Sequence, residues 1–219
     1  MYRLIRSPWN DYWSEIIESA QRSLLLCSPY VGAGPCRRLR ESLLRRSKAA
    51  CFKILMITDL SRDNLLGGAT DAAAIFDLME TVPNMRVRFL PSLHAKVYIA
   101  DEDSAVITSS NLTDNGLSRN YEYGVFLSDP ADVRTINDDI TSYGLLGSEI
   151  SGTALKNLAA TADELRGLYK KADRSAKHEA RREFEKRLRQ ADDEILSLRA
   201  AGRAPHAVFM DAVLYLLNK

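Results

Sequence analysis

The sequence predicts an α/β fold, in which helices flank a mixed β-sheet and a long helical region follows at the C-terminal end. Two observations predict it. Up to about residue 145, short apolar runs typical of buried strands alternate with segments in which apolar residues recur every three or four positions. From Ser151 onward only the helical spacing continues. We therefore divide the chain into a domain at residues 1–148 and a helical C-terminal extension at residues 149–219.

Three helices are expected in the first domain, at residues 9–22, 37–47 and 70–81. The first has Trp13, Ile16 and Ile17 on one side at helical spacing, which indicates a face that packs against a sheet. Pro83 ends the third helix, because proline lacks the N–H that a helical hydrogen bond needs. The sequence VGAGP at residues 31–35 is typical of a turn.

Six strands are expected in the same domain, at residues 23–28, 52–58, 85–90, 95–100, 105–109 and 121–127. Residues 23–28, SLLLCS, are mostly apolar, as in a buried strand, and Pro29 ends the run. The short acidic connection from Asp101 to Asp103 predicts a hairpin between the strands on either side of it. Residues 59–68 are rich in turn residues and are expected to form a loop.

The C-terminal extension is expected to be helical throughout. Between Leu155 and Leu198 apolar residues recur without a proline, which predicts one long amphipathic helix or two collinear ones. Gly202 and Pro205 end this region, and a last short helix is expected at residues 206–217.

Composition excludes several classes of protein. Of the 219 residues, 46% are hydrophobic and 27% are charged, which is typical of a packed globular protein and not of a collagen-like, mucin-like or disordered chain. The net charge of +1 indicates no partner, so any affinity for a polyanion must come from local clusters. Three scattered cysteines indicate neither a disulfide framework nor a zinc site, and no metal or other cofactor is expected. No secretory signal or membrane-spanning run is present, so we expect a soluble, cytoplasmic protein without a membrane partner.

The first candidate for chemistry is the pair His94 and Lys96. Residues two apart on a strand point to the same face, so the imidazole and the ammonium group would project together. Such a pair can act on one phosphate group, because the imidazole can react with it while the cation neutralises its oxygens.

Two further polar pairs repeat this two-residue step on the next strands. Ser109 and Asn111 offer hydrogen-bond donors suited to phosphate oxygens. Asn120 and Glu122 follow, and the Glu122 carboxylate is suited to accept from a histidine nitrogen and fix its tautomer. Since buried polar groups need partners, we expect the three pairs to meet in one site. The alternative is a polar rim at the edge of the sheet.

The spacing of these residues resembles a known family. The phospholipase D superfamily motif, H-x-K-x4-D-x6-G-S-x-N, is matched at the positions of its H, K, D, S and N by His94, Lys96, Asp101, Ser109 and Asn111. The following Asn120-x-Glu122 resembles the extension of the single-motif nuclease branch, which includes small bacterial endonucleases and metal-independent restriction enzymes. One departure is Thr108, which stands where the family has glycine and would crowd the phosphate pocket.

The resemblance implies a role for each matched residue, in a reaction without a metal ion. His94 would attack phosphorus and form a phosphohistidine, while Glu122 would orient a histidine. Asp101 would be structural. The non-bridging phosphate oxygens would be held by Lys96, Ser109 and Asn111.

The implied mechanism needs two histidines, one to attack and one to protonate the leaving oxygen. The chain has three, His94, His178 and His206, and neither of the latter two begins an H-x-K motif. We therefore expect a homodimer in which the His94 residues of two copies face the same phosphate.

The expected substrate is DNA, with RNA as the alternative. Residues 37–48 hold six basic residues against one acidic residue, and we expect Arg37, Arg38 and Arg40 to bind the substrate together with Asn120. A second basic tract at residues 166–189 contains opposite charges at helical spacing, and it is a candidate for a dimerising or spacer helix. The alternative for both tracts is a solvated helix face.

Two other functions remain open. A phospholipase-type enzyme that cleaves a lipid headgroup would share the chemistry but would need an apolar surface that docks on a membrane. A non-catalytic DNA-binding or assembly subunit of a restriction or defence complex, with a helicase or another restriction subunit as partner, would use the long helix instead.

Overall fold

The computed structural model describes residues 2–45 and 51–200. Within these residues one eight-stranded sheet forms the centre of the fold, in the order β1-β7-β6-β5-β2-β3-β4-β8. The strands are β1 (Tyr2–Arg6), β2 (Ser23–Cys27), β3 (Lys53–Thr58), β4 (Asn84–Phe89), β5 (Val97–Ala100), β6 (Ser104–Thr108), β7 (Tyr123–Leu127) and β8 (Ser148–Ile150). β2, β3 and β4 are parallel and the other neighbours are antiparallel, so the sheet is mixed, as predicted.

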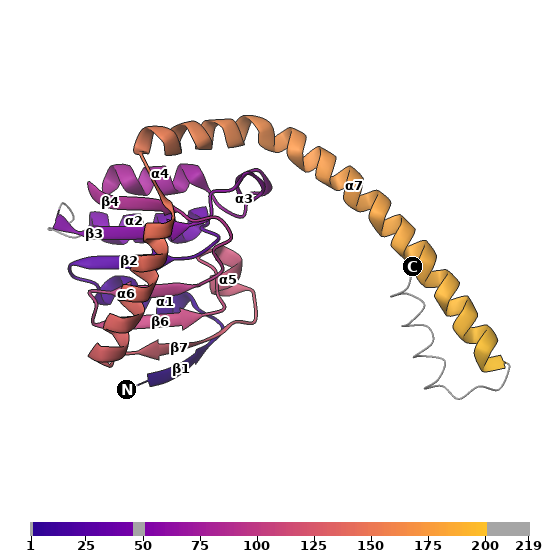
Figure 1. Ribbon diagram of the computed structural model, residues 1–219, viewed down its shortest axis with the longest axis horizontal. Coiled ribbons are helices and arrows are strands. Elements are labelled where there is room, and N and C mark those ends of the chain that lie inside the picture. The colour runs from indigo at the N-terminus through magenta and orange to yellow at the C-terminus, as the bar shows by residue number, and fades with distance from the viewer. Residues whose placement is uncertain (1, 46–50, 201–219) are drawn as a thin grey trace. The chain divides into compact units, whose positions relative to one another are not determined.

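Helices cover both faces of the sheet (Figure 1). On one face lie α1 (Asn10–Ser19), α2 (Ala33–Leu44), α4 (Ala72–Thr81) and the first turns of α7 (Gly152–Ala200). They bury Trp13, Leu39, Ile75 and Leu155 in one apolar core. The other face is crossed by α6 (Pro130–Leu146), which packs Val133 and Ile140 against the sheet. The predicted α/β fold class is confirmed.

Most predicted elements are present with small shifts of their ends, and the predicted hairpin is the antiparallel pair β5 and β6. α2 begins at Ala33, inside the segment predicted as a turn, because Pro35 is tolerated in the first helical turn. α3 (Arg62–Gly67) lies in the segment predicted as a loop. The sequence analysis did not identify β1, β8, α5 (Asp114–Ser118) or α6. The helix expected at 206–217 lies outside the described residues.

The chain divides into two compact units, Met1–Gly167 and Leu168–Lys219, whereas the sequence analysis placed the boundary at 148/149. The first turns of α7 belong to the first unit because Leu155 and Ala162 are buried in its core. The predicted long helix is confirmed, and in the second unit it carries the ion pair between Glu183 and Arg187, one helical turn apart.

Asp101 fastens the β5–β6 hairpin to the start of β2. Its carboxylate accepts hydrogen bonds from the backbone N–H groups of Gln21, Arg22 and Ser23, at 2.6, 2.7 and 2.7 Å. Burial alone would raise the pKa of Asp101, but these three bonds outweigh it and lower the pKa. The residue lies at the opposite end of β5 from Lys96, which supports a structural role.

We predict that Asp101→Asn lowers the free energy of unfolding in urea by about 2 kcal/mol at neutral pH, since an amide cannot accept three charge-assisted hydrogen bonds. Because the folded-state pKa is lowered, the contribution is complete above the ordinary aspartate pKa of about 3.9. It is lost as the pH falls through the lowered value. The matched control is Asp103→Asn, which removes an ion pair to Arg22 between mostly exposed side chains. An equal loss in both variants would contradict the anchoring role.

Candidate active site

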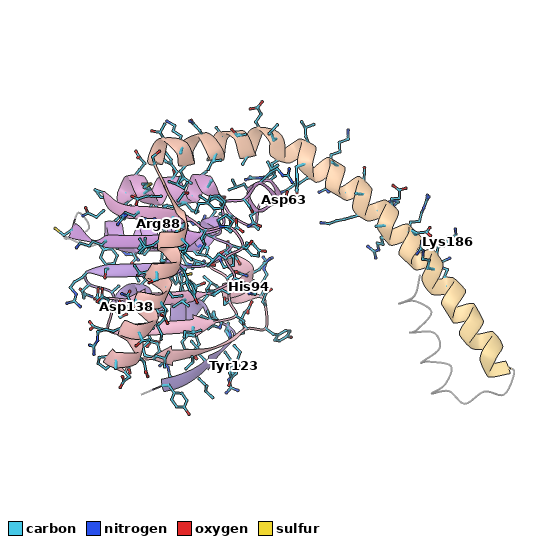
Figure 2. All side chains as sticks on the ribbon, in the orientation of Figure 1. Asp63, Arg88, His94, Tyr123, Asp138 and Lys186 are labelled. Carbon is cyan, nitrogen blue, oxygen red and sulfur yellow. The ribbon has the colours of Figure 1, made fainter. Side chains whose placement is uncertain are left out.

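The predicted site residues gather at one end of the sheet, where β5 and β7 begin and β6 ends. Antiparallel pairing places these three strand ends side by side. We call this the His94 end of the sheet, and Figure 2 shows His94 and Tyr123 there. The prediction that the polar pairs stand on the strands themselves was wrong, because they occupy the connections at the strand ends. Just before β5 lie His94 and Lys96, after β6 lie Ser109 and Asn111, and before β7 lie Asn120 and Glu122.

Lys96 is held close to the imidazole of His94. The Lys96 Nζ donates a hydrogen bond to the His94 carbonyl oxygen at 2.8 Å and lies 3.2 Å from His94 Nε2. In this arrangement Nε2 accepts, so the neutral ring carries its proton on Nδ1. His94 itself is exposed, so Nε2 can be reached from outside the chain.

The Lys96 side chain brings a positive charge into a buried position, since the residue is only 7% exposed. Burial lowers the pKa of Lys96, while the nearby Glu122 carboxylate and Cys27 oppose the change. Burial also raises the pKa of the Cys27 thiol to about 12, so that thiol is neutral at physiological pH. Glu122 is therefore the negative charge that acts on Lys96.

Glu122 is the centre of a second network. Its two carboxylate oxygens accept hydrogen bonds from Ser109 Oγ and, at 3.0 Å, from Asn120 Nδ2. Tyr123 N donates to the same Ser109 Oγ at 3.1 Å, which ties the serine to the start of β7. No described hydrogen bond joins Glu122 to His94, so the expected contact between glutamate and histidine is not made within one chain.

Ser7 is a positioning residue that the sequence analysis missed. Its Oγ donates to the carbonyl oxygen of Asn120 at 2.7 Å and accepts from Glu122 N at 2.6 Å. These bonds hold the Asn120–Glu122 segment against the end of β1. No local signal in the sequence connects Ser7 with residues more than a hundred positions away.

Asn111 has spare hydrogen-bonding capacity at the His94 end of the sheet. Its side-chain Oδ1 is buried and has no hydrogen-bond partner among the described residues. A buried polar atom without a partner is unfavourable by about 1–3 kcal/mol, and a ligand that supplies the partner recovers this energy. Since amide oxygen and nitrogen exchange places by a flip, the group can meet either a donor or an acceptor of a substrate.

The three arginines predicted to bind substrate are not joined to this network. Arg38 forms an ion pair with Asp114 at 3.4 Å, and Arg40 donates to Thr81 Oγ1 at 3.0 Å. Arg37 is exposed and lines a groove between α2 and α4. Their role in binding stays a prediction.

The sequence of residues 14–143 matches the family model described as "Cardiolipin synthase, PLD-like domain". The chain belongs to this phospholipase D-like family. The match covers more than half of the chain and includes His94, Lys96, Ser109, Asn111 and Glu122. The comparison with curated proteins gives no match.

Three solved structures share the fold. The phospholipase D family member Nuc from Salmonella typhimurium is 19% identical, with a TM-score of 0.52 over 68% of this chain and 97% of its own. NucT from Helicobacter pylori is 17% identical, with a TM-score of 0.54 over 68% of this chain and 99% of its own. Phosphatidylserine synthase from Haemophilus influenzae is 14% identical, with a TM-score of 0.57 over 80% of this chain and 45% of its own. The chain thus has the fold of the phospholipase D-like family to which it belongs, and these structures share that fold.

Thr108 departs from the glycine of the phospholipase D motif, and the residue opposite it accommodates the change. Thr108 pairs with Gly124 in the β6–β7 register, where a Cβ atom on residue 124 would lie 2.9 Å from the Thr108 Cβ. The Thr108 hydroxyl accepts from Ser110 N at 2.9 Å and donates to the Tyr123 carbonyl oxygen at 3.3 Å. It is therefore engaged within the loop that positions Ser109.

Two further observations concern the rest of the described chain. Residues 2–45 and 51–200 contain no group of three histidine, cysteine or acidic side chains that could hold a metal ion. None of their helices combines the length and the apolar character that crossing a membrane requires. Of the other two histidines, His178 lies on α7 in the second unit and His206 lies outside the described residues.

The lowered pKa of Lys96 predicts how stability depends on pH. In the pH range between this lowered pKa and the ordinary lysine value of about 10.4, the unfolded chain binds more protons than the folded one. Stability therefore rises with pH in that range. We expect the free energy of unfolding of the wild type to increase relative to that of Lys96→Met as the pH rises through that range. Chemical denaturation of both proteins over a pH series measures this, and a constant difference would contradict the buried charge.

Proposed function

We propose that the protein is a metal-independent phosphodiesterase that cleaves DNA through a phosphohistidine on His94. The observation that carries the proposal is the buried Lys96 ammonium held 3.2 Å from Nε2 of an exposed imidazole. A cation that is removed from water at this place interacts more strongly with a phosphate than a hydrated cation does. The resemblance of Asn120-x-Glu122 to the nuclease branch favours a nucleic acid as the source of that phosphate.

In the first step the Nε2 lone pair of His94 attacks phosphorus. The P–N bond forms while the bond from phosphorus to the leaving oxygen breaks. A phosphate oxygen replaces the imidazole as the acceptor for Lys96, which frees Nε2 to react. Asn111 supplies a further donor for the charge that develops on the non-bridging oxygens. Ser109 supplies another when its hydroxyl turns from Glu122 to the phosphate, while the bond from Asn120 still holds the carboxylate.

The leaving oxygen needs a proton, and we assign it to His94 of a second copy of the chain. That imidazolium gives up its proton as the P–O bond breaks. The neutral ring then takes a proton from the water that attacks phosphorus, the P–N bond breaks, and both histidines return to their starting states. The proposed enzyme is therefore a homodimer with one shared site, because two different protonation states are needed at the same phosphate.

Glu122 would stabilise the protonated form of His94, either in its own chain or in the second copy. Its bonds from Ser109 and Asn120 fix the carboxylate in place without a bond to His94 of the same chain. A fixed carboxylate favours the protonated form of an imidazole that approaches it.

A lipid phosphodiester is the second candidate substrate, because the description of the matching family model names a cardiolipin synthase. The chemistry at phosphorus would be the same, so only the substrate distinguishes the two functions. Plasmid DNA and phosphatidylcholine vesicles should be tested side by side in EDTA. Binding of DNA without cleavage of either would favour a non-catalytic DNA-binding or assembly subunit.

We predict that His94→Ala abolishes DNA cleavage while the protein stays folded, because the side chain is exposed. The wild type should cleave plasmid DNA equally well with and without EDTA, since Lys96 and neutral donors supply the charge stabilisation. Gel assays of cleavage and circular dichroism of the fold measure the two properties. The control is His178→Ala, on α7, which should retain activity. Full activity of folded His94→Ala, or loss of wild-type activity in EDTA that magnesium restores, would contradict the mechanism.

The shared site predicts the behaviour of mixed dimers. If two His94 residues act on one phosphate, a dimer of one wild-type and one His94→Ala chain should be nearly inactive. Differently tagged chains, coexpressed and purified through both tags, provide this species. Independent sites would leave it with about half of the wild-type activity, and an active monomer in sedimentation would also rule the shared site out.

A further inference from the structure

Three exposed residues beside Glu122 have no role in the mechanism above: Arg6, Arg119 and Tyr121. Arg6 ends β1 and lies opposite Tyr123 in the β1–β7 register. Arg119 and Tyr121 stand on either side of Asn120, in the connection that leads into β7.

The two segments that hold these residues are joined directly. Ser7, next to Arg6, donates to the carbonyl oxygen of Asn120 at 2.7 Å, and Ser7 N donates to the Glu122 carbonyl oxygen at 3.1 Å. The segments that carry Arg6, Arg119 and Tyr121 therefore lie side by side next to Glu122, and all three residues are exposed there.

The guanidinium groups of Arg6 and Arg119 have no partner among the described residues. Many other arginines of the first unit are paired with an acidic residue, as are Arg3, Arg22, Arg38, Arg62, Arg86 and Arg88. Glu122, the carboxylate nearest in sequence to Arg119, is already bonded to Ser109 and Asn120. Two uncompensated positive charges next to a phosphodiester site favour an anionic ligand.

Aromatic rings are exposed at the same place. Tyr121 is 103% exposed, so its ring packs against none of the described residues. Tyr123 is 56% exposed, on the face of the sheet that Arg6 shares. Guanidinium groups that bind phosphates, next to aromatic rings on which bases stack, are the combination that binds single-stranded nucleic acid. A duplex keeps its base faces stacked inside and offers none to a tyrosine.

We propose that Arg6, Arg119 and Tyr121 form a binding surface for single-stranded nucleic acid that leads the strand to His94. The inference rests on the proposed function, since it assumes that the phosphate at His94 belongs to a nucleic acid. It specifies further that this nucleic acid is single-stranded. It also places the contacts with the strand on β1 and the α5–β7 connection instead of on α2.

The test measures binding apart from cleavage, in the full-length His94→Ala background. Fluorescence anisotropy with a short labelled single strand, as DNA and as RNA, is compared with the same sequence as a duplex. Tyr121→Ala should weaken single-strand binding about 5- to 150-fold, as expected for one lost base–aromatic stack. Tyr121→Phe should bind as tightly as the parent, because it keeps the ring.

Arg6→Ala and Arg119→Ala should each lower the slope of log affinity against log salt by about 0.7, the value for one lost phosphate contact on a single strand. Arg134→Ala is the matched control, because Arg134 is an exposed arginine on α6, away from this surface. It should change neither the affinity nor the slope.

Unchanged single-strand affinity in Tyr121→Ala, or equal losses for single strand and duplex, would overturn the proposal. So would a Tyr121→Ala protein that becomes monomeric in sedimentation while its affinity is unchanged, since the surface would then bind a second copy. Hydrolysis of bis(p-nitrophenyl) phosphate by the wild type separates the proposed function from this proposal, because it measures the reaction at phosphorus without the binding of a strand. A wild type that hydrolyses no diester would defeat the proposed function, while the binding results would still decide this inference.

Discussion

The pairing of β5, β6 and β7 sets the geometry of the candidate active site. The last hydrogen bonds of this ladder run from Thr108 N to the Lys96 carbonyl oxygen, at 3.1 Å, and from Ser109 N to the Tyr123 carbonyl oxygen, at 3.0 Å. A slip of one residue in either pair would turn every side chain of that strand to the other face, and Lys96, Ser109 and Glu122 would no longer meet. Asp101 holds the far end of the same hairpin to β2, so it protects the register on which the arrangement of the candidate site residues depends.

The candidate site contains a buried positive charge, which is unfavourable for folding. Burial of Lys96 disfavours its ammonium form, and in the described chain it is compensated only in part, by Glu122 and by the bond to the His94 carbonyl oxygen. Asn111 likewise has a buried side-chain oxygen that has no partner within residues 2–45 and 51–200. Unsatisfied groups gathered at one end of a well-packed sheet are typical of a binding site, where a ligand supplies the missing partners.

Much of this arrangement could be predicted from the sequence, because strand alternation and the spacing of polar pairs are local signals. His94 and Lys96 were identified in this way, and the hairpin that follows them was located by Asp101 to Asp103. The connections at the strand ends could not be predicted, since they depend on contacts between distant segments such as the bond from Ser7 to Asn120. The assignment of substrate binding to arginines in residues 37–48 has the same cause, because it was made without knowledge of contacts between distant segments. A count of charges does not reveal that Arg38 is paired with Asp114, while Arg6 and Arg119 have no partner in the part of the chain that the structure describes.

The His94 end of the sheet is open, and this bears on the kind of substrate it can take. His94, Ser109 and Asn120 are all exposed, whereas a cavity lined by Lys53, Asn84 and Arg86 lies at the opposite ends of β3 and β4. A small substrate held by one chain would need an enclosing pocket to exclude water and fix its position. A polymer does not, because contacts outside the reacting group can position it and a second copy of the chain can close the site from the other side. The open His94 end, the Glu122 carboxylate without a described bond to His94, and the absence of described partners for Arg6 and Arg119 therefore all favour a long anionic substrate. A substrate of this kind agrees with the proposed homodimer.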